Sequence, residues 1–123
     1  MEQSILKSTK KNLGVSDADT SFDHDIITFI NSAFSTLNQV GIGPADFTIE
    51  DDSVEWEDFL EAGNILNQAK TFIFLFCRMM FDPPQTGFLI AAFEKQLEEH
   101  LVRLNMAWEA TGWTDPDPPV VTA

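Results

Sequence analysis

The side chains that could do chemistry are few, and none of them completes a recognisable site. The stretch Asp17-Ala18-Asp19-Thr20-Ser21 begins like a calcium-binding loop. The sixth position of such a loop requires Gly and the twelfth requires Glu, but this chain has Phe22 and Thr28 there. We therefore interpret the stretch as a polar break that leads into a helix. The acidic cluster Asp51 to Asp58 follows no ligand-spacing rule either, and a solvated or partner-facing loop is favoured there.

The remaining nucleophilic and titratable residues point away from catalysis. His24 and His100 lie far apart in the sequence and have no metal-ligand spacing. Cys77 is the only cysteine, so no disulfide can form within the chain, and its apolar neighbours favour a small buried side chain. No Gly-rich phosphate loop and no Ser-centred elbow is present. The sequence predicts no enzyme activity, no catalytic residue, no metal and no cofactor.

Net charge is the strongest bulk signal. Among 123 residues, 7 Lys and Arg stand against 20 Asp and Glu, which gives a net charge of −13. Binding to a phosphate backbone needs clustered cations, so sequence-specific DNA binding is disfavoured. The three lysines Lys7, Lys10 and Lys11 make the N-terminus basic, and no Lys or Arg follows until Lys70. This asymmetry suits head-to-tail contact between copies, although acidity that simply keeps the chain soluble explains the charge as well.

Membrane association is not expected. The apolar run from Phe72 to Cys77 is too short to span a bilayer, and Arg78 follows it directly. The N-terminus has no apolar stretch after its charged residues, as a signal peptide would. We expect a soluble, intracellular protein.

The first half of the chain predicts two helices and a long loop. Residues 2–12 form a short basic helix that ends at Leu13-Gly14. Thr20, followed by Asp23 three residues later, has the capping-box arrangement and predicts the start of a long helix that Gly41 ends. The segment 45–58 is irregular, and within it Phe47-Thr48-Ile49 is either a short strand or part of the loop. Such long loops are usually functional or run along a neighbour.

The second half predicts two further long helices. One begins between Phe59 and Asn64, ends at Phe81 and is apolar almost all round, which implies a central position or a face covered by another subunit. The segment Asp82-Pro83-Pro84 then breaks the helix. The next helix runs from about Gln85 to Ala110. Its predicted inward stripe consists of Phe88, Leu89, Ala92, Phe93, Leu97, Leu101, Leu104 and Trp108.

Together these elements predict an all-α fold in one domain. Residues 1–112 are expected to form a small bundle of three long helices with a short N-terminal helix and one long loop. Residues 113–123 are Pro-rich and are expected to form an extended C-terminal tail.

The stretch from Lys70 to Asn105, KTFIFLFCRMMFDPPQTGFLIAAFEKQLEEHLVRLN, resembles the head–tail adaptor (head-completion, connector) proteins of long-tailed bacteriophages. The shared features are an aromatic-rich helix, the helix-breaking Asp82-Pro83-Pro84, and a following helix that begins with Phe88-Leu89-Ile90. The resemblance implies a ring, typically a dodecamer, beneath the portal. Such a ring extends the DNA channel and offers a platform for the next neck or tail component. The resemblance also implies that the protein is made in the host cytoplasm and is located in the virion neck, between capsid and tail.

This resemblance gives three groups of residues an expected role. The contact between copies is expected to involve Lys7, Lys10, Lys11, Trp56, Phe74 and Leu75. The acidic residues expected to face the channel, where DNA passes without specific binding, are Glu50, Asp51, Asp52 and Glu55. The tail is expected to dock on the portal through Trp113, Pro116, Pro118, Pro119, Val120 and Val121.

A second hypothesis is a small acidic protein that mimics DNA and inhibits a nucleic-acid-binding enzyme. It explains the charge equally well. It does not explain the Asp82-Pro83-Pro84 break, the helix that is apolar all round or the Pro-rich tail.

Overall fold

The protein is described by a computed structural model that covers residues 3–112. Its elements are α1 (Ile5–Leu13), α2 (Asp23–Gln39), α3 (Trp56–Phe59), α4 (Asn64–Phe81) and α5 (Gly87–Thr111). Within the described residues no strand is present, and Ser4 and Glu55 form an isolated antiparallel bridge. The predicted all-α bundle is confirmed, and the short α3 is an addition to it. The predicted tail, residues 113–123, lies outside the described residues.

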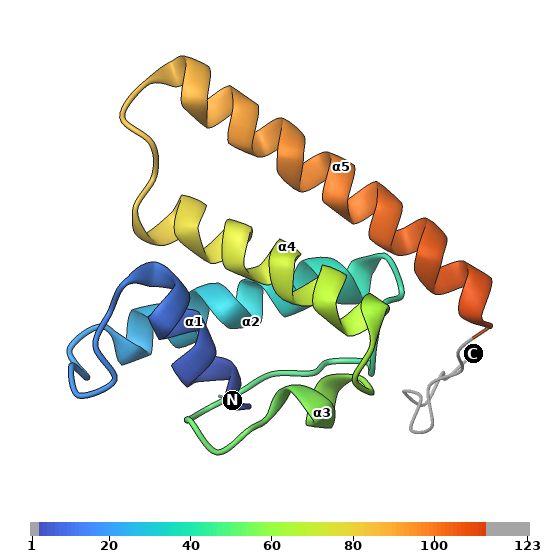
Figure 1. The fold of residues 1–123 in the computed structure, drawn as a ribbon, viewed down its shortest axis with the longest axis horizontal. Coiled ribbons are helices and arrows are strands. Elements are labelled where there is room, and N and C mark those ends of the chain that lie inside the picture. The colour runs from blue at the N-terminus through green and yellow to red at the C-terminus, as the bar shows by residue number, and fades with distance from the viewer. Residues whose placement is uncertain (1–2, 113–123) are drawn as a thin grey trace, which may run out of the picture.

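Helix α4 is the centre of the bundle. Figure 1 shows it between α5 on one side and α1 and α2 on the other, and it packs against all three helices. Its buried residues are Leu66, Ala69, Phe72, Ile73 and Cys77. Of the two explanations for an apolar helix in so small a domain, the structure shows the central position.

The join between α1 and α2 depends on a buried ion pair. Lys10 is 2% exposed, and its Nζ lies 2.8 Å from Asp23 Oδ1. The same ammonium donates a hydrogen bond to the carbonyl oxygen of Asp17 at 3.2 Å. The predicted capping box with Thr20 does not form, because Phe22 and not Thr20 is the N-cap residue of α2. Helix α2 begins at Asp23 after Phe22, which has no side-chain capping bond.

The long loop belongs to the core. The Asn31 side chain donates to the carbonyl oxygen of Ile49 at 2.9 Å and accepts from the Ile49 amide at 2.8 Å. The Asn31 side chain thus forms both backbone hydrogen bonds of Ile49 that a neighbouring strand would otherwise form. The Ile49 side chain is buried. The strand alternative for residues 47–49 is therefore wrong.

The predicted stripe of α5 is only partly correct. Leu104 and Trp108 are its buried residues, and Phe93, Leu97 and Leu101 are half-buried. Near the start of the helix, by contrast, Phe88 is 82% and Leu89 is 46% exposed, and Ala92 is exposed as well. The end of α5 is fixed to the end of α2, because Trp108 Nε1 donates to the carbonyl oxygen of Gly41 at 2.7 Å. The first turns of α5 have no comparable anchor among the described hydrogen bonds.

Substitution of Phe72 by Asp should unfold the domain. Phe72 is 1% exposed, and the change removes its buried ring and leaves an unpaired carboxylate in the core. The expected loss is at least about 3–5 kcal/mol, comparable with the whole stability of a small domain. Circular dichroism during heating checks this, with Thr71→Asp on the exposed side of α4 as the control that melts like the native protein. Cooperative, native-like melting of Phe72→Asp would contradict the core assignment.

Candidate functional site

The acidic stretches that could suggest metal binding are locally satisfied turns. Asp19 accepts hydrogen bonds from the amide and hydroxyl of Ser21, and Asp51 accepts the same pair from Ser53. These bonds stabilise the charged carboxylates and lower the pKa of both Asp19 and Asp51. Within the described residues no cluster of three or more His, Cys, Asp or Glu could hold a metal ion.

Cys77 is a buried structural residue. Its side chain lies inside the bundle on α4, and burial raises the pKa of the thiol to about 12. A thiol with this pKa stays protonated at neutral pH and is a poor nucleophile. The sequence-based interpretation of Cys77 as a small apolar side chain is confirmed.

The residues predicted to face the DNA channel lie together on one loop. Glu50, Asp51, Asp52 and Glu55 are all exposed. Asp52 Oδ2 lies 3.8 Å from Lys7 Nζ, and both side chains are partly exposed. The structure thus brings a predicted channel residue next to a residue predicted for the contact between copies. Whether this loop faces DNA stays a prediction.

Two residues predicted for the contact between copies lie inside the domain. Lys10 is buried in its ion pair with Asp23, and Trp56 is completely buried. Trp56 Nε1 donates to Ser8 Oγ at 3.1 Å and so ties α3 to α1. Lys10 and Trp56 therefore serve the packing of a single copy. A sequence pattern alone misses this because both contacts join residues distant along the chain.

Two of the other predicted contact residues, Lys11 and Phe74, line a basic hollow between α1 and α4. It has a volume of about 380 Å³ and is lined by Ser8, Lys11, Asn12, Trp56, Lys70 and Phe74. Lys70 Nζ lies 5.3 Å from the centre of the Trp56 ring, which also meets the Phe74 ring edge-on at 5.8 Å. The ion pairs within residues 3–112 involve Lys7 and Lys10. Lys11 and Lys70 are thus left without a carboxylate partner there.

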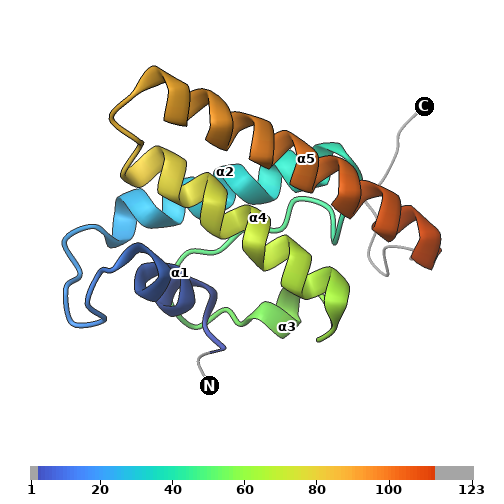
Figure 2. The ribbon, with the colours of Figure 1, turned by 45° about the horizontal axis from the view of Figure 1, so that its top comes forward.

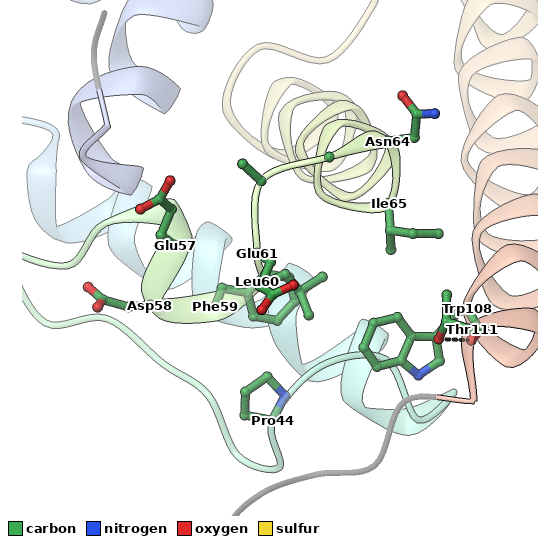
Figure 3. Close-up of a pocket in the computed structure, with 12 residues that line it drawn as sticks. Pro44, Glu57, Asp58, Phe59, Leu60, Glu61, Asn64, Ile65, Trp108 and Thr111 are labelled. Carbon is green, nitrogen blue, oxygen red and sulfur yellow. Dashed lines mark hydrogen bonds between the residues drawn. The ribbon is translucent and has the colours of Figure 1, made fainter.

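A second cavity, of about 520 Å³, lies where the connection from α3 to α4 approaches the end of α5 (Figure 3). Pro44, Leu60, Ile65 and Trp108 supply apolar walls, and Ile65 points from α4 toward the side on which Trp108 lies. The acidic residues of its lining come from the segment 57–61. The lining combines three separate parts of the chain, so sequence spacing does not reveal it. Its apolar walls favour the binding of an apolar side chain over a role as a catalytic site.

Sequence reasoning also missed a face on α5. We call it the outer seam of α5, and it consists of six exposed residues: Phe88, Ala92, Lys95, Glu99, Val102 and Met106. Phe88, Val102 and Met106 are among the exposed large apolar residues of the described chain. The steps of four and three residues could have revealed the seam. The sequence analysis instead assigned Phe88 and Ala92 to the inward apolar stripe of the same helix.

The residues predicted to dock on the portal, Trp113, Pro116, Pro118, Pro119, Val120 and Val121, lie outside the described residues. Among the helices that are described, none is long and apolar enough to cross a membrane.

Comparison with known protein families gives a match over most of the chain. A family model described as phage connector protein matches residues 5–111, a range that includes all five helices. No curated protein and no solved structure matches the chain.

Cys77 should be almost inert toward a disulfide reagent in the folded protein. With a pKa of about 12 against 9.0 for an exposed cysteine, its thiolate fraction near neutral pH is lower by roughly a thousandfold. Colorimetric titration with Ellman's reagent should show one reactive thiol only after denaturant is added. Rapid reaction of the folded protein would contradict the burial of Cys77.

Proposed function

The chain belongs to the phage connector protein family, and we propose that it is the head–tail adaptor that forms a ring beneath the portal of a tailed phage. Membership makes it a structural virion component that connects head and tail, and not an enzyme. In our proposal the ring, of about twelve copies in view of the family resemblance, extends the DNA channel. It also offers a platform for the next neck or tail-completion protein. The observation that carries this proposal is the family match over residues 5–111.

The charge of the chain supports a role beside DNA that does not include holding it. A net charge of −13 repels the phosphate backbone, and DNA must slide through a connector without a deep energy well. We place the exposed residues Glu50, Asp51, Asp52 and Glu55 toward the channel. A DNA-mimic inhibitor would share this charge, but it would not account for a connector-family match along the chain.

For the contact between copies, we propose that the exposed lysines of α1 meet an acidic flank of the next copy. Lys11 is exposed and has no carboxylate partner within the described residues, and Lys7 has only a long ion pair to Asp52. Lys70, at the same hollow, adds a further cation. Phe74 and Leu75 on α4 are half-buried and can contribute apolar area. Single surface ion pairs are weak, but a ring repeats each one around its circumference.

The tail is our candidate for the grip on the portal. Residues 113–123 contain Pro116, Pro118 and Pro119, and proline has a restricted backbone that costs less entropy to order on a partner. Trp113 and Val120-Val121 supply apolar side chains for the interface. The connector would occupy the virion neck after synthesis in the host cytoplasm.

Reversal of the charge at Lys7 and Lys11 should impair ring formation on the portal. The double variant Lys7→Glu/Lys11→Glu replaces attraction to the acidic flank by repulsion, and higher salt should weaken the native assembly in the same way. Native mass spectrometry of the portal complex measures both effects. The variant Lys7→Arg/Lys11→Arg keeps the charge and should assemble normally. Assembly that is indifferent to salt and to charge reversal would contradict this contact.

Deletion of residues 113–123 should separate folding from attachment. The buried core of the described chain lies between Ile5 and Trp108, so the truncated protein should melt like the full chain. Its binding to portal-bearing heads, measured by co-sedimentation, should be lost. Normal binding of the truncated protein would show that the portal grip lies elsewhere on the chain.

A further inference from the structure

The outer seam of α5 suggests a second mode of association. Its six residues follow one another at alternating steps of four and three, the spacing of a coiled-coil seam. Helix α5 packs on α4 through its opposite face, which carries Leu104 and Trp108. Both ribbon views show α5 on the outside of the bundle (Figures 1 and 2). All six seam residues are exposed in a single copy.

The seam is complementary to itself when two copies run in opposite directions. The first residue then faces the last, so Phe88 meets Met106 and Ala92 meets Val102. At the centre, Lys95 of each copy meets Glu99 of the other, because a two-fold axis repeats every contact. In a parallel pair each residue would face its own counterpart. Lys95 would lie against Lys95 and Glu99 against Glu99, which is unfavourable.

The antiparallel alignment sorts the seam contacts by type. The apolar pairs lie toward the ends and the charged pairs at the centre. A charged residue in a coiled-coil seam fixes register and orientation at some cost in affinity.

We propose that two free copies of this chain pair through the outer seams of their α5 helices, in antiparallel orientation. The contact is isologous and therefore closes with two copies, unlike the head-to-tail contacts of a ring. It covers the exposed side chains of Phe88, Val102 and Met106 before the protein joins a virion. The pairing does not depend on the portal, so it goes beyond the head–tail role.

The interface is short, which sets its expected strength. From Phe88 to Met106 the seam spans about 27 Å of helix at 1.5 Å per residue. This is less than three full heptads, so the dimer should dissociate on dilution.

Charge exchange tests the pairing. Sedimentation equilibrium of the full chain should show dimers that Lys95→Glu and Glu99→Lys each weaken by about tenfold or more, since each change turns two attractive contacts into two repulsive ones. The double variant Lys95→Glu/Glu99→Lys should recover dimerisation. Glu94→Lys makes the same charge change as Glu99→Lys at an exposed position of α5 outside the seam, and it should dimerise like the native chain. Circular dichroism verifies that every variant is folded.

Single cysteines test the direction of the helices. In the antiparallel pair Ala92 faces Val102, whereas the two copies of residue 92 lie about 15 Å apart along the helix. A disulfide requires Cα atoms within about 7 Å. A mixture of Ala92→Cys and Val102→Cys proteins should therefore cross-link, and either protein alone should not.

Three results would overturn the proposal: a native chain that stays monomeric at high concentration, a double charge variant that does not recover, or cross-linking of Ala92→Cys alone. Attachment of Lys95→Glu to portal-bearing heads is measured in parallel. Loss of the dimer with attachment retained supports the paired seam as a separate contact and leaves the connector role intact.

Discussion

Burial of α4 is the constraint on which the rest of the structure depends. A helix that is apolar on nearly every side must be covered on nearly every side, and α1, α2 and α5 each contribute a face to it. Phe72, Ile73 and Cys77 disappear into the resulting core. Among residues 3–112, which the structure describes, no further helix covers α5 from outside. The exposed apolar surface therefore appears on α5, the outer layer, and makes it the natural surface for contacts with other chains.

The distribution of charge follows from the same packing. One of the seven basic residues, Lys10, is buried in a pair with Asp23, where it joins the first two helices. Truncation of Asp23 would leave the buried Lys10 ammonium without its carboxylate partner, so this pair holds the N-terminal part of the fold in place. Most acidic side chains remain at the surface, and Lys11 and Lys70 are gathered at one hollow between α1 and α4. A protein with this surface can stand beside DNA without binding it and still attract an acidic neighbour.

The sequence predicted the positions of the helices better than the burial and the contacts of their side chains. Apolar spacing and the Gly and Pro positions located the four substantial helices, because these signals are local. The burial of Lys10 and Trp56 escaped prediction because it depends on Asp23 and Ser8, which only the folded chain brings close. Periodicity also assigned Phe88 and Ala92 to the inward stripe of α5. A helix with apolar residues on two faces gives one merged pattern, and only the position of α4 shows which face is covered. The basic hollow was anticipated in part, through Lys11 and Phe74, whereas Lys70 was not.

The mass of the complex formed with the portal tests the connector role most directly. Purified chain is mixed with assembled portal rings, and native mass spectrometry counts the copies bound to each ring. Our account predicts a closed ring of many copies per portal, of the order of one copy for each portal subunit. A chain that remains monomeric or dimeric in the presence of the portal, with no mass added to the portal ring, would contradict the proposed ring-forming adaptor.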